Sequence, residues 1–112
     1  MEQILENSKT QMRRGVLEYC ILLVLQKGDE YPSSIIQKLK DAELIVVEGT
    51  LYPLLVRLKN QGFLSYRWEE STQGPPRKYY SITPSGRVQL QELDASWKEL
   101  TQSIDALKCQ QE

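Results

Sequence analysis

Histidine is absent from the 112 residues, and cysteine occurs only at Cys20 and Cys109. The lack of histidine excludes Ser-His-Asp and Cys-His nucleophilic sites and zinc sites with histidine ligands. The two cysteines have no CxxC spacing and form no disulfide framework. The sequence also lacks a phosphate-binding glycine loop and a paired-carboxylate motif. We therefore expect a protein that is not an enzyme and that needs neither a cofactor nor a metal.

Long hydrophobic runs are missing as well. The longest one, CILLVL at residues 20–25, is far shorter than the ~20 residues that span a bilayer. The first ten residues, MEQILENSKT, are acidic and polar and do not resemble a secretory signal. These features predict a cytoplasmic protein without a membrane partner.

The net charge of −1 hides an uneven distribution of charge along the chain. Residues 49–87 carry six basic and two acidic side chains, a local net charge of +4 between two acidic flanks. Exposed charges act over about one Debye length, roughly 10 Å at 0.1 M salt. A basic segment of this kind is typical of a surface that contacts a nucleic-acid backbone.

Apolar periodicity predicts three helices in the first half of the chain. The first covers residues 2–26, with a possible break near its start, and the second runs from Pro32 to about residue 42, with serine as a candidate cap. Residues 44–47 are predicted as a short extended piece. The third helix opens at residues 48–50, with Thr50 as its cap and Pro53 in its first turn, and a left-handed Gly62 ends it.

Two alternating segments, residues 64–68 and 78–82, predict a β-hairpin. Its tip, EESTQGPPR at residues 69–77, is polar and contains Gly-Pro-Pro. Three helices followed by a hairpin are the order of a winged helix-turn-helix. The predicted fold class is mainly α with a small β-hairpin (α+β), in which a winged helix-turn-helix domain carries a long C-terminal helix.

Thr83 and Pro84 open that last helix, which runs to about Lys108. Its apolar residues recur at alternating steps of three and four, which is a heptad pattern: Leu90, Leu93, Trp97, Leu100, Ile104 and Leu107. We expect a winged domain over residues 1–83 and a dimerisation helix over residues 84–112, together one compact unit. A homodimer would cover the apolar seam; the alternative is that the helix folds back on its own domain.

A major groove admits one helix, and the hairpin of a winged domain reaches the neighbouring backbone or minor groove. The candidate DNA-contacting residues are Thr50, Tyr52, Pro53 and Arg57 of the third helix, Lys38 of the second, and Gly74, Pro75, Arg77 and Lys78 near the hairpin tip. The alternatives are that the charged residues of the third helix simply face solvent, and that Gly-Pro-Pro only forms the turn of the hairpin.

The same residues resemble a known family. Residues 48–53 (EGTLYP) with Arg57 and Leu58, and residues 74–80 (GPPRKYY) with Thr83 and Gly86, are similar to the signatures of PadR-type transcriptional regulators. The resemblance implies a repressor that binds a palindromic operator as a homodimer, with the first helix assisting the last in dimerisation. The single C-terminal helix resembles the shorter subfamily. Tyr31-Pro32 replaces the Tyr-Gly pair common in the family, which alters one backbone turn.

Trp97 occupies a seam position where a coiled coil prefers Leu or Ile. Some members of the family that resemble multidrug sensors have a tryptophan at this position, which implies a slot for a small aromatic effector. Its candidate lining is Trp97, Met12, Val16, Tyr19, Leu93 and Thr101. An indole face favours neutral or cationic aromatics; the alternative is that Trp97 is simply a large core residue.

Two functions remain open at this point. The first is a sequence-specific DNA-binding transcriptional regulator. The second is a winged-helix module that binds proteins and never touches DNA. Salt-sensitive binding to a duplex distinguishes them, because only the first neutralises phosphates.

Overall fold

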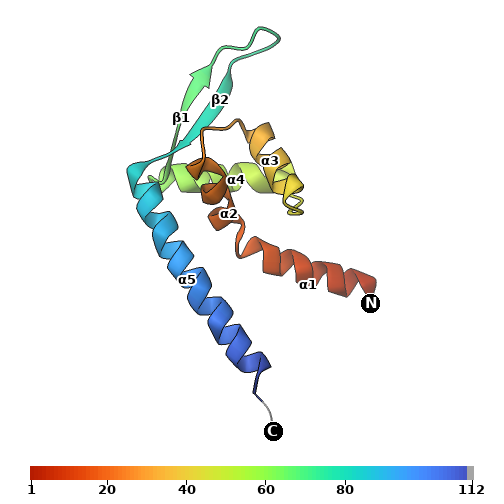
Figure 1. The fold of residues 1–112 in the computed structure, drawn as a ribbon. Coiled ribbons are helices and arrows are strands. Elements are labelled where there is room, and N and C mark those ends of the chain that lie inside the picture. The colour runs from red at the N-terminus through yellow and green to blue at the C-terminus, as the bar shows by residue number, and fades with distance from the viewer. Residues whose placement is uncertain (111–112) are drawn as a thin grey trace.

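The computed structural model describes residues 1–110, which form a mainly α fold with one small sheet. The elements are α1 (Glu2–Arg14), α2 (Leu17–Gln26), α3 (Pro32–Asp41), α4 (Glu48–Asn60), β1 (Leu64–Glu69), β2 (Arg77–Ile82) and α5 (Pro84–Lys108). In Figure 1, α2, α3 and α4 form the body, and the hairpin and α5 leave it in opposite directions. The predicted fold class is confirmed; residues 111–112, the end of the expected dimerisation segment, lie outside the described residues.

The segment predicted as one helix over residues 2–26 consists of two helices that meet at Gly15 and Val16. Val16 has φ −115° and ψ 0°, which is outside the regular helical range. The break follows from packing as well as from the low helix propensity of glycine. Helix α2 is anchored by four buried side chains, whereas α1 has none and extends from the body as an exposed arm (Figure 1).

The hydrophobic core joins α2, α3 and α4 to the base of the hairpin and the first turns of α5. Its members have at most 8% of their surface exposed: Leu17, Ile21, Leu22, Leu25, Ile35, Leu39, Val46, Leu51, Leu55, Leu58, Leu64, Tyr80 and Leu90. Within residues 1–110, the buried set includes no charged side chain. On α4, the core side is formed by Leu51, Leu55 and Leu58.

Two details predicted for the start of α4 are wrong. The extended Val47 is the N-cap, and its carbonyl accepts hydrogen bonds from the amides of Thr50 (3.0 Å) and Leu51 (3.1 Å). Thr50 therefore lies within the first turn, and no side chain caps the helix. Pro53 lies inside the helix, where its ring removes one main-chain hydrogen bond.

The other helix ends follow the predictions more closely. Gly62 has φ +87° and ends α4 in the left-handed region. Pro32 is the first residue of α3, although Tyr31 rather than a serine is its N-cap. Thr83 caps α5, because its hydroxyl accepts a 3.0 Å hydrogen bond from the amide of Gly86.

The strands β1 and β2 pair antiparallel, with Tyr66 opposite Tyr80 and Trp68 opposite Lys78. The expected strands thus extend by one residue each, and residues 70–76 form the exposed tip. At the base of the hairpin, Glu30 and Tyr80 exchange backbone hydrogen bonds of 2.9 and 3.1 Å. This isolated bridge attaches β2 to the turn before α3.

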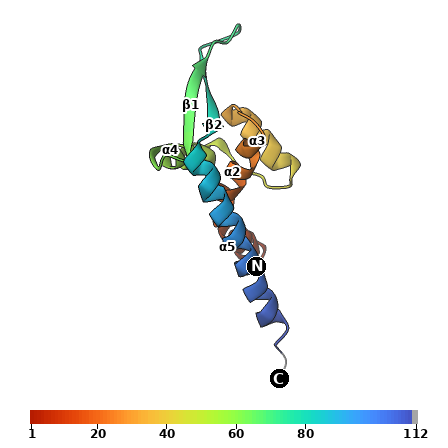
Figure 2. The same ribbon diagram turned by 60° about the vertical axis from the view of Figure 1, so that its left-hand side comes forward.

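Helix α5 packs on its own domain through its first half only. Leu90 is buried, and the Tyr19 hydroxyl of α2 donates a 2.6 Å hydrogen bond to Asp94. Beyond Trp97 the seam is exposed, with Leu100 51% and Leu107 67% accessible. The helix projects from the body in both views (Figures 1 and 2), and the molecule measures 63 × 36 × 22 Å. No helix among residues 1–110 is long and apolar enough to cross a membrane.

Candidate nucleic-acid interface

Helix α4 presents two distinct faces. Leu51, Leu55 and Leu58 are buried in the core. The opposite face leaves Tyr52 45% and Val56 52% exposed, an unusual amount of accessible apolar surface. A helix anchored by one face with the other free can enter a major groove without disturbing the core.

A groove of about 450 Å³ lies between this exposed face, the start of α3 and the hairpin. Its lining combines aromatic rings with basic groups: Tyr31, Pro32, Ser33, Tyr52, Val56, Trp68, Pro76, Arg77, Lys78 and Tyr80. The structure therefore brings together three of the predicted contact residues, Tyr52 from α4 and Arg77 and Lys78 from β2. We call this set the α4–wing groove.

The cations of the wing are held over aromatic rings. The Arg77 guanidinium lies 3.9 Å from the ring centroid of Tyr31, which packs 4.7 Å from the Tyr79 ring. The Arg67 guanidinium lies over the second ring of this pair, 4.6 Å from the Tyr79 ring centroid. It also donates a 3.1 Å hydrogen bond to the Asp29 carboxylate. Cations over aromatic faces gain about 0.5–1 kcal/mol each at exposed sites. The stack therefore orders Arg77 before any phosphate arrives.

Lys78 is positioned in a similar way on the other face of the hairpin. Its ammonium lies 4.5 Å from the Tyr66 ring and 5.6 Å from the Trp68 ring. Lys59 of α4 approaches the same Tyr66 ring at 5.9 Å. Neither lysine forms an ion pair among residues 1–110, so both ammonium groups are available to an external anion.

The remaining predicted contact residues lie outside the α4–wing groove. Arg57, on the flank of α4 that faces α2, lies with its Nε 3.3 Å from a Glu18 carboxylate oxygen. That oxygen is buried and accepts no hydrogen bond from the described residues. Lys38 forms a 2.7 Å ion pair with Glu30. Each cation is shared with a carboxylate, so a phosphate would compete with an ion pair for its charge.

Thr50 lines a separate cavity near α1, and Pro53 is exposed on α4. Gly74 and Pro75 are exposed at the far end of the hairpin, consistent with their predicted place at the tip. The structure thus separates the predicted contact residues: three line the α4–wing groove, two pair with carboxylates, two lie at the tip, and Thr50 and Pro53 lie elsewhere on α4.

Sequence reasoning missed the aromatic part of the groove. The sequence predicts no contact role for Tyr31 or Trp68, yet both line the groove and the Tyr31 ring lies under Arg77. The signal was the interleaving of rings and cations in YRW at 66–68 and RKYY at 77–80. Such interleaving within paired strands places cations beside rings across the ladder.

A comparison with known protein families identifies the family to which this fold belongs. The profile of the transcriptional regulator PadR-like family matches residues 21–92, more than half of the chain, from within α2 through the hairpin to the first turns of α5. The chain belongs to the PadR-like family. Its members are DNA-binding transcriptional regulators, and this assignment favours DNA binding over a pure protein-interaction module.

Solved PadR-like structures share the architecture over nearly the full length. A PadR-like transcription factor from Bacteroides fragilis is 64% identical, with a TM-score of 0.77 over 90% of this chain and 98% of that one. A PadR family regulator from Eggerthella lenta is 31% identical, with a TM-score of 0.87 over 98% and 96%. An uncharacterized protein from Lysinibacillus sphaericus is 30% identical over 100 residues, which are 87% of this chain and 92% of that protein.

The second predicted site of this PadR-like chain surrounds Trp97. A cavity of about 100 Å³ is lined by four of the predicted residues, Val16, Tyr19, Leu93 and Trp97, together with Gly15, Ser96 and Leu100. Met12 and Thr101 do not line it. Ligand pockets commonly measure about 300–1,000 Å³, so one copy of the chain cannot enclose a drug-sized molecule here.

The hydrogen bond to Asp94 fixes the Tyr19 ring 6.3 Å from the Trp97 ring. This bond, with a smaller effect of burial, raises the pKa of Tyr19 to about 12. The phenol therefore stays neutral at physiological pH. Next to it, burial raises the pKa of the Cys20 thiol, which suits a packing role rather than a reactive one.

Proposed function

We propose that this PadR-like regulator is a cytoplasmic repressor that binds a palindromic operator as a homodimer. Helix α4 enters the major groove through Tyr52 and Val56, and the hairpin contacts the backbone through Arg77 and Lys78. A small aromatic molecule bound near Trp97 releases the operator. The observation that carries the proposal is the α4–wing groove, in which an exposed helix face and ordered cations adjoin each other.

The homodimer follows from the two elements that a single copy leaves uncovered. Ile104 is 43% and Leu107 67% exposed in the outer half of α5. Helix α1 has no buried residue and exposes Ile4 (70%) and Met12 (78%). Monomeric proteins rarely expose contiguous apolar patches of this kind. A two-fold partner covers both and places two α4 helices about 34–36 Å apart, one duplex turn.

The proposed effector site needs the same partner. The cavity at Trp97 opens at the point where the buried half of α5 gives way to the exposed half. Two such cavities that face each other across a dimer seam would form one larger slot between two indoles. For the ligand to lower operator affinity tenfold, it must bind the released state better by about 1.4 kcal/mol.

Fluorescence anisotropy with a labelled duplex from upstream of the protein's own coding region tests DNA binding. We expect selective binding that weakens steeply as salt rises from about 50 to 200 mM. Arg77→Ala and Lys78→Ala should each reduce the salt slope by about one unit. Lys98→Ala, an exposed lysine on α5 remote from the groove, is the matched control and should leave the slope unchanged. Absence of binding to any duplex at low salt would reject the proposal.

Sedimentation equilibrium tests the homodimer separately. Ile104→Glu places a charge on the exposed seam and should shift the protein toward monomer. Gln102→Glu introduces the same charge at an exposed position on the side of α5 opposite the seam and should leave the association unchanged. Equal behaviour of the two variants would argue against the α5 seam as the interface.

A further inference from the structure

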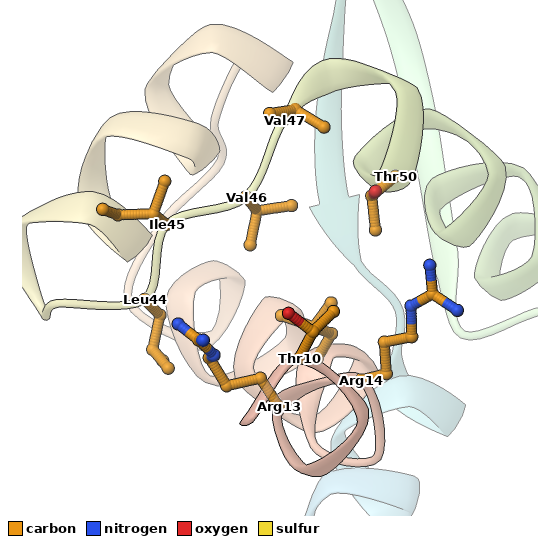
Figure 3. Close-up of a pocket in the computed structure, with 9 residues that line it drawn as sticks. Thr10, Arg13, Arg14, Leu44, Ile45, Val46, Val47 and Thr50 are labelled. Carbon is orange, nitrogen blue, oxygen red and sulfur yellow. The ribbon is translucent and has the colours of Figure 1, made fainter. Parts of the chain in front are cut away.

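A cavity of about 280 Å³ lies on the opposite flank of α4 from the wing. It is enclosed by the last turns of α1, the extended segment 44–47 and the first turn of α4, and its lining is Thr10, Arg13, Arg14, Leu17, Leu44, Ile45, Val46, Val47 and Thr50. Figure 3 shows the residues of α1 on one side and those of segment 44–47 on the other. We call it the α1–α4 cavity. It shares no residue with the cavity at Trp97.

One side of this cavity is apolar. Leu17 and Val46 are buried at its floor, whereas Ile45 and Val47 are 69% and 65% exposed at its mouth. Covering a branched aliphatic side chain removes apolar area from water, at about 25 cal/mol per Å². An occupant with a hydrocarbon body would gain this stabilisation from residues that the protein alone leaves uncovered.

The other side is cationic. Arg13 and Arg14 take part in none of the ion pairs within residues 1–110, and no carboxylate lines the cavity. The only hydrogen bond of either guanidinium among the described residues is a long one, 3.4 Å from Arg13 Nε to the Lys9 carbonyl. In Figure 3 the two guanidinium groups lie at opposite ends of the cavity with Thr10 between them. A guanidinium with free donors matches the geometry of a carboxylate.

From these two sides we infer that the α1–α4 cavity binds a small organic carboxylate with an apolar body, such as a short aliphatic acid. The carboxylate takes hydrogen bonds from Arg13 or Arg14 and the hydroxyl of Thr10 or Thr50, and the hydrocarbon covers Val46 and Val47. The site is distinct from the proposed aromatic slot at Trp97, because it prefers an anion. Its occupant would contact both the arm α1 and the first turn of α4, the proposed recognition helix.

Nuclear magnetic resonance titration of the full chain, labelled with ¹⁵N, tests this site with hexanoate as the probe. We expect saturable shifts of the amides of Thr10, Leu44 and Thr50, with a Kd of about 1 mM as befits so small a ligand. 1-Hexanol has the same hydrocarbon without the charge and should bind at least about tenfold more weakly. Inorganic phosphate has charge without hydrocarbon and should leave these amides unshifted.

Variants separate the arginines from general charge effects. Arg13→Gln/Arg14→Gln should weaken hexanoate binding by about tenfold or more, because it removes charge-assisted hydrogen bonds. Arg87→Gln, an exposed arginine at the start of α5 outside the cavity, is the matched control and should bind hexanoate like the parent protein. Both substitutions lie on exposed or half-buried side chains, so the fold should remain intact.

Three results would overturn the inference. Equal affinity for 1-hexanol would make the cavity a purely apolar one. Shifts by phosphate as large as those by hexanoate would indicate an anion site without an apolar part. Unchanged hexanoate binding in the double variant, together with a loss of duplex affinity, would assign the arginines to DNA phosphates instead.

Discussion

Among the six glycines, Gly86 leaves the least space for a side chain, and its replacement by alanine should be strongly destabilising. A Cβ atom added there would lie 2.2 Å from the carbonyl oxygen of Phe63 and 2.7 Å from a side-chain carbon of Ile82. The Phe63 carbonyl cannot move freely, because it accepts a 3.0 Å hydrogen bond from the amide of Thr83, the cap of α5. The first turn of α5 must therefore shift away from the corner after α4.

The magnitude follows from opposing effects. In an open helical position, Gly→Ala stabilises by about 1 kcal/mol. Here overpacking costs about 1–3 kcal/mol or more, and loss of the Thr83 cap costs about 1 kcal/mol. We expect a net loss of about 1–3 kcal/mol for Gly86→Ala, which lowers Tm by roughly 4–13 °C in a domain of this size.

Thermal unfolding by circular dichroism, at one fixed protein concentration because association shifts Tm, measures this difference. Gly49→Ala is the matched control, since a Cβ at Gly49 in the first turn of α4 meets nothing within 4 Å. Its Tm should stay the same or rise by a few degrees. A Gly86→Ala protein that melts within about 3 °C of the parent, a shift below 1 kcal/mol, would refute the reasoning.

Three further substitutions probe contacts described above. Tyr31→Leu removes the ring beneath Arg77 and should weaken duplex binding about two- to fivefold, the range of one cation–π contact, whereas Tyr31→Phe should not; equal anisotropy curves for Leu and Phe would contradict this. Tyr19→Phe deletes the hydrogen bond to Asp94, so Tm should fall by a few degrees. Because the pKa of Tyr19 is raised to about 12, its contribution to folding stability is complete below about pH 10 and is lost as the pH rises through 12. If the Tm difference between the parent protein and Tyr19→Phe grew as the pH rose, this prediction would be wrong. Glu18→Gln removes the carboxylate that holds its arginine partner on α4 and should tighten duplex binding by up to about fivefold; unchanged or weaker binding would contradict a DNA contact by this arginine.

The helices and the hairpin could be predicted because each has a local cause. Alternation between Leu64 and Trp68 gives a strand, and Thr83-Pro84 gives a capped helix start, both as observed. The break at Gly15 and Val16 depends instead on packing. The residues before it resemble those after it in helix propensity, but only α2 has a core to pack against.

The site was predictable in composition rather than in arrangement. The EGTLYP and RKYY motifs located α4 and the wing, and the structure brings Tyr52 and Lys78 from these motifs into one groove. The sequence could not show that Arg57 pairs with Glu18, because these residues are 39 positions apart and meet only through the packing of α2 on α4. Long-range ion pairs of this kind leave no periodic signal.

The backbone bridge between Glu30 and Tyr80 has a consequence for the duplex. It fastens the base of the hairpin to the turn before α3, so the wing keeps a fixed inclination to α4. In the proposed complex, the angle between the wing and α4 is fixed, so the duplex must bend to contact both. Deformation energy depends on the base steps that are bent, even where no side chain touches them. Among operators with the same contacted bases, those with easily bent pyrimidine–purine steps between the groove and the wing should bind most tightly.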